Sequence, residues 1–496
     1  MRKKTPLVVP LVLATALAGG AVLAPAAQAA VDTSRHVVVI GIDGLLFDKI
    51  APANTPNLDA MISSGYSSRT TLYADPMAPT FSGPGWATNL TGVWPDKHRV
   101  LGNTWSGSSI TSYPDFLTRL EQNDSAHKTY AASTWGPIVD DSEGPALITS
   151  AVDSRYASTG DADTAAAAAA YLKSTGPNAT FLQFDDVDHA GHDCGSSCAD
   201  YTAELEEIDG YIGRLTTAVK ARPGYASEKW TYIVTSDHGH TPTGGHGGST
   251  EPERASFIVK SGYGVTATTP AIQPKNVDIA ADVLAAFGVA IPAVLDGQPL
   301  ATVSTDPFDT RVGALQARVD ETAVPAAVLG WTKSMPTGWS VDNSSMGSGG
   351  VTEWRGWSLA TDAFWTRTDP GQQRESNVRE RGVFAVADSD EWSDKTRSGL
   401  FTSSLISQNY TVTGKSSVTL TFGSHYRKEG SETASVQVSF DGGAWTNLFT
   451  YSGDTIAKIE SRSIAVPAGA SGMRVAYKLA NGDNNWYWAI DNPQVK

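Results

Sequence analysis

The segment Val37-Val38-Val39-Ile40-Gly41-Ile42-Asp43-Gly44 carries the clearest structural signal in this chain of 496 residues. Its β-branched apolar run predicts a strand buried on both faces, as strands of parallel sheets are. Gly41 and Gly44 let the backbone turn sharply and let a ligand approach Asp43 closely. An acidic residue placed there lies where open α/β sheets gather their ligands, beyond the carboxyl ends of the strands.

Two further apolar runs have the same relation to acidic loops. Residues 180–184 and 231–235 predict buried strands, and each is followed at once by an Asp-bearing loop. Helical patterns separate the strands at residues 55–64, 163–173, 202–220 and 277–287. This alternation predicts an α/β domain over residues 30–305, with a mostly parallel sheet sandwiched by helices.

The character of the sequence changes after a linker predicted at residues 306–330. Nine of the 14 tryptophans lie at or beyond Trp331, and apolar residues alternate at 418–422, 436–440 and 475–479. These patterns predict an antiparallel, jelly-roll-like β-sandwich over residues 331–496. A glycan is one partner that exposed aromatic residues of this domain could bind. We expect a core role instead for most of its tryptophans, among them Trp354, Trp357, Trp365, Trp486 and Trp488.

The first 29 residues have the pattern of a signal peptide. Three basic residues precede an apolar run at 7–23, and Ala27-Gln28-Ala29 offers small residues for cleavage. The alternative, a retained membrane anchor, is disfavoured by Pro10 and the Gly19-Gly20 pair within the run. We therefore expect a secreted protein with no membrane association.

The net charge argues against polyanionic partners. It is −15 for the whole chain, and loss of Arg2, Lys3 and Lys4 with the signal peptide makes it −18. Such a protein has no bulk electrostatic attraction to nucleic acid or to anionic lipid. Bound metal cations could nevertheless attract a small anionic substrate.

The two cysteines are Cys194 and Cys198. In an oxidising compartment this spacing predicts a local disulfide that stiffens a loop. The alternative, a thiolate metal site, lacks a second pair of cysteines.

Asp and His residues near the strand ends are candidate metal ligands. Asp237-His238 follows the third strand, and His246 lies in a loop between two pairs of glycines. Asp188 and His192 can converge across one helical turn, and the pair Asp185 and His189 has the same spacing and competes for the role. Imidazole and carboxylate ligands suit zinc, and two such sites about 4 Å apart are typical of phosphoesterases.

The segment around Ser82 is the candidate nucleophile region. Ser82 occupies a predicted N-cap position, Pro84 lies in the first turn, and Gly92 ends a short helix. A hydroxyl at a helix N-terminus faces free N–H groups that favour phosphate. Thr80 is the competing hydroxyl, and Trp86 or Trp105 could stack on a leaving group, although we expect them in the core.

These motifs resemble the alkaline phosphatase superfamily, and specifically its type I phosphodiesterase/nucleotide pyrophosphatase branch. The resemblance covers residues 35–302 and rests on four motifs: Gly41-Ile42-Asp43-Gly44, Thr91-Gly92-Val93-Trp94-Pro95, Asp188-His189-Ala190-Gly191-His192 and Ser236-Asp237-His238-Gly239. The family's nucleophile lies nine residues before Thr91, which is Ser82. The position 21 residues beyond Ser82 is Asn103, where the family has an amide that binds a phosphoryl oxygen.

The resemblance also implies the metal ligands. One zinc ion would be held by Asp188, His192 and His246, and a second by Asp43, Asp237 and His238, with Ser82 bridging towards it. This alignment selects Asp188 and His192 over Asp185 and His189. The chain has Ser-Gly-Pro-Gly-Trp where nucleotide-cleaving members have Thr-Phe-Pro-Asn, which weakens a transfer of nucleotide specificity. No Arg follows Ser82 as in alkaline phosphatases proper, and the Cys-based maturation motif of sulfatases is absent.

We therefore predict a secreted hydrolase of phosphate esters that uses two divalent metal ions, zinc by preference. Its expected substrates are small phosphodiesters or nucleotide pyrophosphates, cleaved through a phospho-Ser82 intermediate with Asn103 and the Gly83 N–H holding a phosphoryl oxygen. One alternative is a phosphomonoesterase or phosphotransferase of the same fold. The other is a glycan-binding protein whose hydrolase domain is inactive.

Overall fold

A computed structural model describes residues 31–142 and 144–496. The predicted signal peptide lies outside the described residues. Within them, no helix is both long enough and apolar enough to cross a bilayer.

The first half of the chain forms a seven-stranded sheet in the order β2-β7-β6-β1-β5-β3-β4. Strands β6, β1, β5, β3 and β4 are parallel, and β7 pairs antiparallel with both β6 and β2. The strands are β1 (Arg35–Ile42), β2 (Tyr66–Thr71), β3 (Thr129–Ser133), β4 (Ser154–Ala157), β5 (Ala179–Phe184), β6 (Lys229–Thr235) and β7 (Ala255–Gly262). The predicted mostly parallel α/β sheet is confirmed.

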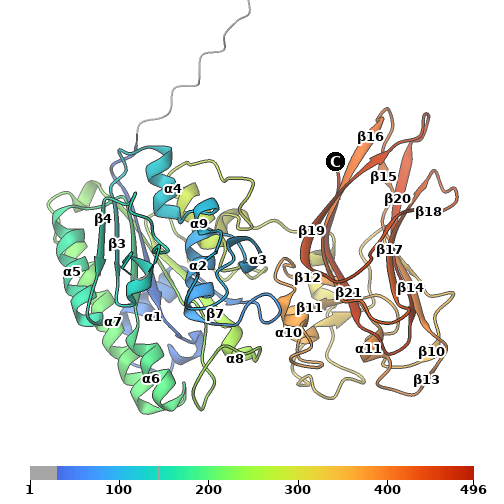
Figure 1. Cartoon of the computed structure of the whole chain (residues 1–496), viewed down its shortest axis with the longest axis horizontal. Coiled ribbons are helices and arrows are strands. Elements are labelled where there is room, and N and C mark those ends of the chain that lie inside the picture. Colours follow the sequence, from blue (N-terminus) through green and yellow to red (C-terminus); the bar gives the residue numbers. More distant parts are fainter. Residues whose placement is uncertain (1–30, 143) are drawn as a thin grey trace, which may run out of the picture.

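Helices cover both faces of this sheet (Figure 1). Side chains of β1 alternate between two cores: Val38 and Ile40 pack with α1, α5 and α7, whereas Val37 and Val39 pack with α2, α4 and α9. This alternation explains why the strand is apolar throughout. The helices are α1 (Pro56–Ser64), α2 (Ser82–Thr91), α3 (Pro95–His98), α4 (Phe116–Asn123), α5 (Asp161–Ser174), α6 (Asp186–Cys194), α7 (Ala199–Lys220), α8 (Glu251–Arg254) and α9 (Asp278–Ala286).

The second half of the chain forms a sandwich of antiparallel sheets, as predicted. One sheet has the order β19-β16-β21-β12-β11-β8 and the other β18-β17-β20-β14-β9, with β15 on β20. Its elements are β8 (Trp331–Thr332), β9 (Ser340–Asp342), β10 (Ser348–Gly349), β11 (Ser358–Thr361), α10 (Asp362–Trp365), β12 (Val383–Asp388), α11 (Ser389–Trp392), β13 (Arg397–Ser398), β14 (Phe401–Ile406), β15 (Tyr410–Thr411), β16 (Ser417–Tyr426), β17 (Thr433–Phe440), β18 (Thr446–Thr450), β19 (Thr455–Ala465), β20 (Gly472–Gly482) and β21 (Tyr487–Val495). We call this part the sandwich.

The tryptophans of the sandwich mostly fill its core. Trp354, Trp357, Trp365 and Trp488 are fully buried, and Trp486 is partly buried against the same core. The four fully buried rings therefore offer no aromatic face for a glycan, whereas Trp445 of the same sandwich is 40% exposed. Phe308, from the segment predicted as a linker, is also buried in this core.

Candidate metal centre and nucleophile

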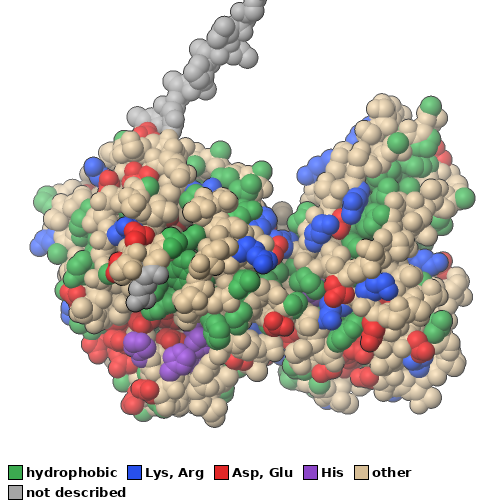
Figure 2. All heavy atoms as spheres, in the orientation of Figure 1, with side chains coloured by type: hydrophobic (Ala, Val, Ile, Leu, Met, Phe, Trp, Pro, Cys, Tyr) green, Lys and Arg blue, Asp and Glu red, His purple; other side chains and the backbone are tan. Residues whose placement is uncertain are grey.

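Three neighbouring strands bring the candidate ligands to one edge of the sheet. Strand β1 pairs with β5 on one side and β6 on the other, and all three run parallel. Asp43 follows β1, Asp188 and His192 lie on α6 directly after β5, and Asp237-His238 follows β6. Figure 2 shows histidine side chains gathered on the α/β part, with acidic side chains beside them.

Glycines make room for these side chains at two close approaches. A Cβ on Gly44, whose φ is +63°, would lie 2.8 Å from Asp188 Oδ1 and 2.7 Å from the His240 ring. A Cβ on Gly85 would lie 2.5 Å from the backbone oxygen of Asp237, so helix α2 packs directly on the loop that carries the candidate ligands Asp237 and His238. Larger residues at either position would push the cluster apart.

The first ligand group consists of Asp43, Asp237 and His238, with one ligand atom of each within 4.8 Å of the others. His238 Nε2 lies 3.4 Å from Asp43 Oδ1 and 3.4 Å from Asp237 Oδ2. Asp43 Oδ1 and Asp237 Oδ2 are buried and have no hydrogen-bond partner. Buried carboxylate oxygens without a donor are costly, and a divalent cation would satisfy both.

The remaining oxygens of these carboxylates are fixed by the protein. Asp43 Oδ2 accepts hydrogen bonds from Trp86 Nε1 (2.9 Å) and Gln183 Nε2 (3.1 Å). Asp237 Oδ1 accepts one from the Gly44 N–H at 3.2 Å. Each carboxylate is thus oriented through one oxygen and offers the other, an arrangement common around bound metals. Trp86 is buried and has this orienting role, so it does not stack on a leaving group.

The second group lies next to the first and shares His238. It joins Asp188, His238, His240 and His246, whose ligand atoms also lie within 4.8 Å of one another. His192 Nε2 is 3.3 Å from Asp188 Oδ2 and 3.1 Å from His246 Nε2, and its side chain is 49% exposed. The structure therefore brings the six predicted ligand side chains close to one another, but the second group contains His240 where the sequence suggested His192.

Backbone carbonyls orient two of the histidines. The Nδ1–H of His246 donates to the Thr80 carbonyl at 2.7 Å, and that of His238 donates to the Gly239 carbonyl at 3.2 Å. Both rings consequently present an unprotonated Nε2 to the cluster, which is the form that binds a metal.

Crowding of the carboxylates shapes the electrostatics of the site. Burial raises the pKa of Asp43 well above the ordinary carboxyl range, and the neighbouring Asp237 adds to this effect. Burial and the charge of Asp188 raise the pKa of Asp237 in the same way. Burial also acts to raise the pKa of Asp188, but hydrogen bonds from His192 and His240 outweigh it and leave the pKa lowered. Divalent cations would relieve the repulsion that these shifts reflect.

Ser82 is the hydroxyl that faces the cluster. Its Oγ lies 3.3 Å from His238 Nε2. The N-cap of α2 is Phe81, in extended conformation, so Ser82 is the first helical residue and not the predicted N-cap. Because the helix does not use its hydroxyl for capping, the Ser82 side chain is free to serve the site.

Thr80, which carries the competing hydroxyl, is hydrogen-bonded to the loop that carries His246. Its Oγ1 donates to the Gly248 carbonyl at 3.0 Å and accepts from the Gly247 N–H at 2.9 Å. The side chain is completely buried. Thr80 thus fixes the histidine loop, and the structure gives it no access to a substrate.

Asn103 lies beside the start of helix α2. Its Oδ1 accepts a hydrogen bond from the Gly83 N–H at 2.9 Å. The Gly83 N–H, which we expected to hold a phosphoryl oxygen, is therefore occupied. The bond also fixes the Asn103 side chain and leaves its Nδ2 donor for an incoming oxygen.

The competing pair Asp185 and His189 forms a separate contact. His189 Nε2 lies 3.1 Å from Asp185 Oδ2, and the His189 side chain is 65% exposed. Asp185 Oδ1 accepts from Gln183 Nε2 at 2.9 Å. Neither residue belongs to the two ligand groups.

The disulfide between Cys194 and Cys198 forms as predicted. The Ser196 N–H and Oγ within its ring both bond the Thr241 carbonyl at 3.1 Å. The ring therefore supports the loop between His240 and His246.

His240 is the site residue that sequence reasoning missed. Its Nε2 donates to Asp188 Oδ1 at 2.6 Å, and the ring is fully buried. The sequence signal was the closely spaced pair in Asp237-His238-Gly239-His240. Because Asp188 Oδ2 faces His192, the structure allows His240 to orient this carboxylate from the other side.

We predict that His240→Ala weakens metal binding without abolishing it. Loss of the hydrogen bond to Asp188 Oδ1 leaves the ligand less firmly oriented, which typically costs about 10–100-fold in metal affinity. Competition with a chromogenic chelator would measure the affinity. His189→Ala is the matched control and should bind metal normally. Equal affinities in both variants and the wild type would exclude an orienting role for His240.

Comparisons with known proteins agree with these motifs. The sequence profile of the type I phosphodiesterase / nucleotide pyrophosphatase family matches residues 37–143 and 111–306, which together exceed half of the chain. No curated protein matches. Similar solved structures include BT1596, a 2-O GAG sulfatase (12% identity, 66% of this chain and 80% of that chain, TM-score 0.41), and murine ectonucleotide pyrophosphatase / phosphodiesterase 5 (14% identity, 52% and 96%, TM-score 0.37). None of these structural similarities is close enough to transfer a substrate.

Proposed function

Because the chain belongs to the type I phosphodiesterase / nucleotide pyrophosphatase family, we propose that it is a secreted, two-metal hydrolase of phosphate diesters. The observation that carries this proposal is the position of the Ser82 hydroxyl, 3.3 Å from a histidine shared by two adjacent ligand groups. Asp43, Asp237 and His238 would hold one divalent cation, and Asp188, His192 and His246 the other. Bound cations supply Lewis-acid stabilisation of the phosphoryl oxygens and favour ionisation of a hydroxyl.

The residues of the chain have distinct roles in the proposed reaction. Ser82 Oγ attacks phosphorus, the Oγ–P bond forms, and the bond from phosphorus to the leaving oxygen breaks. The intermediate is a phosphodiester of Ser82 that keeps the second ester group, and the departing oxygen takes up a proton. Water then attacks its phosphorus, the Oγ–P bond breaks, the Ser82 hydroxyl is restored, and a phosphate monoester is released. Asn103 Nδ2 donates to a phosphoryl oxygen as charge builds in the transition state. Thr80 and Trp86 hold His246 and Asp43 in position.

The surroundings of Asn103 favour a diester over a monoester. A cavity of about 370 Å³ opens there, and Trp105, Ile110 and Pro137 are among its walls. None of the described residues lining it is Lys or Arg. A dianionic monoester would find no cationic side chain in this cavity, whereas a diester has one charge fewer and a second substituent that could occupy it.

The test compares a chromogenic aryl phosphodiester with the corresponding monoester, each with and without a chelator. We expect the diester to have the higher kcat/KM and the chelator to abolish its turnover, with recovery when zinc is restored. A higher kcat/KM for the monoester would favour the phosphatase alternative. Absence of turnover on every ester, despite bound metal, would favour an inactive hydrolase domain.

A further inference from the structure

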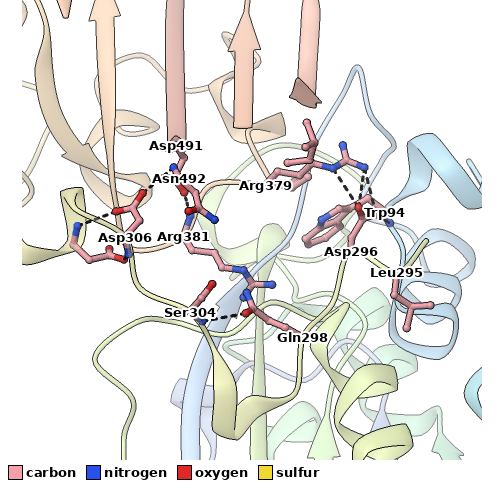
Figure 3. Close-up of a pocket in the computed structure, with 13 residues that line it drawn as sticks. Trp94, Leu295, Asp296, Gln298, Ser304, Asp306, Arg379, Arg381, Asp491 and Asn492 are labelled. Atoms are coloured by element: carbon pink, nitrogen blue, oxygen red, sulfur yellow. Dashed lines mark hydrogen bonds and ion pairs between the residues drawn. The ribbon is translucent and has the colours of Figure 1, made fainter. Parts of the chain in front are cut away.

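Three consecutive charged residues of the sandwich contact the α/β part of the protein. Arg379, Glu380 and Arg381 lie just before strand β12. Figure 3 shows Arg379 and Arg381 extending from the sandwich toward residues of the α/β part. Each of the three residues forms an ion pair with a residue of the α/β part, across the junction between the two parts. These partners lie close to helix α2, which begins at Ser82 and which we call the nucleophile helix.

Arg379 is connected to the end of helix α2 through Asp296. Its Nη2 lies 3.0 Å from Asp96 Oδ2 and 3.3 Å from Asp296 Oδ2. Asp296 in turn accepts the Trp94 N–H at 3.0 Å, and its own N–H donates to the Gly92 carbonyl at 2.9 Å. Gly92 is the C-cap of α2, the helix that begins at Ser82. Asp296 therefore joins Arg379 to the end of the nucleophile helix.

Arg381 is connected to the same helix indirectly, through Asp278 and the turn before α9. Its two terminal nitrogens pair with both carboxylate oxygens of Asp278 at 2.8 Å. Asp278 also accepts the Lys275 N–H at 2.8 Å, which fixes the turn before α9. Within that turn, Asn276 Nδ2 donates to Asn89 Oδ1 of α2 at 2.9 Å and to the carbonyl of Ser236 at 3.1 Å. Ser236 immediately precedes the candidate ligand Asp237.

Glu380 completes the set by pairing with Lys275 at 3.0 Å, and both side chains are buried. Buried ion pairs are poor sources of net stability compared with apolar contacts, but they fix geometry and are costly to break on one side. A cavity of about 200 Å³ lies beside these pairs, with Trp94, Val378 and Ile459 among its walls. Beside this cavity, Trp94 and Val277 of the α/β part pack with Val378 and Ala457 of the sandwich in one buried apolar cluster, so the ionic contacts add directional contacts to apolar packing.

We propose that Arg379 and Arg381 of the sandwich are positioning residues for the Ser82 nucleophile, acting through Asp296 and Asp278 on the far end and the flank of helix α2. The sandwich then contributes to catalysis, because it fixes the position of helix α2. The effect that we expect on kcat rests on the proposed function. The effect that we expect on helix α2, which the two arginines hold in place, does not depend on it.

The test uses the full-length protein with Arg379→Ala, Arg379→Lys and Arg381→Ala. Arg397→Ala is the matched control, because Arg397 also forms an ion pair, with Asp483, and packs over Trp392, and both partners belong to the sandwich. We expect the two junction alanine variants to lower kcat for the diester by about 10-fold or more with little change in KM, since small displacements of a nucleophile are costly. Lysine at 379 should restore part of the loss, because it keeps the charge opposite Asp296.

Hydrogen exchange supplies a readout that needs no activity. Backbone amides of Gly83 and of residues 85–92 should exchange about 10-fold faster in Arg379→Ala than in the wild type, while those of strand β17, in the other sheet of the sandwich, do not change. The proposal is overturned if folded Arg379→Ala and Arg381→Ala retain wild-type kcat and wild-type exchange in α2, or if Arg397→Ala changes both equally. Should the wild type hydrolyse no phosphate ester, the proposed function fails while the exchange result still decides this inference.

Discussion

Ser82→Ala should lower kcat for a phosphodiester by about three orders of magnitude or more, because removal of a covalent nucleophile typically has an effect of at least this size. Ser82 is 7% exposed and its hydroxyl is not used as a helix cap, so alanine fits and loses the 3.3 Å contact with His238 Nε2 but no helix cap. Metal content should not fall, since the six candidate Asp and His ligands remain. Steady-state kinetics and metal analysis of the same preparation would check both expectations.

Thr80→Ser is the matched control for this experiment. Serine keeps the hydroxyl that donates to Gly248 and accepts from Gly247, so this variant should retain most of its activity. Full activity in Ser82→Ala combined with inactivity in Thr80→Ala would reverse the assignment of the nucleophile. Trapping of radiolabelled phosphate on the wild type, but not on Ser82→Ala, would add direct support for the covalent intermediate.

The sequence was informative where local pattern and function coincide. Asp43 and Asp237 could be predicted as neighbours because each follows a long apolar strand, and the carboxyl ends of parallel strands meet at one edge of the sheet. Strand β3 (Thr129–Ser133) could not be predicted in this way, because its Thr-Tyr-Ala-Ala-Ser sequence has little β-branched character. Its five residues are buried by their neighbours, β5 and β4, and context of this kind outweighs intrinsic strand preference.

Contacts between distant segments set the limit of what sequence could show. The partner of His240 is Asp188, 52 residues away, and no periodicity links them. The same holds for Arg379 and Asp296, which are 83 residues apart. Arg379 belongs to the sandwich and Asp296 to the α/β part. Ser82 illustrates a finer limit: the pattern placed the start of helix α2 within one residue, but only the backbone conformation of Phe81 shows which residue is the cap.

The second large effect is expected for Asp188→Asn, measured against Asp185→Asn. Both residues are buried acids of the same short segment, and both have a histidine four residues later. Asp188 lies in contact with His192 and His240, whereas Asp185 pairs with the exposed His189 and with Gln183. Asparagine is nearly isosteric but lacks the charge that binds a divalent cation. We expect Asp188→Asn to lose one metal equivalent and about 10³-fold in kcat, since metal-ion catalysis contributes several kcal/mol.

Asp185→Asn should keep both metal equivalents and activity within about 10-fold of the wild type, because its amide can still accept from Gln183 and the ligands are untouched. Metal analysis after dialysis against chelator and reconstitution with zinc would measure the stoichiometry, and thermal unfolding would establish that both variants fold. If Asp185→Asn lost the metal and Asp188→Asn kept it, the competing pair Asp185 and His189 would be the ligands. Helix α6 would then have to present Asp185 and His189 to the cluster in place of Asp188 and His192. As α6 is oriented in the structure, Ser82 would lie beside one metal site instead of two.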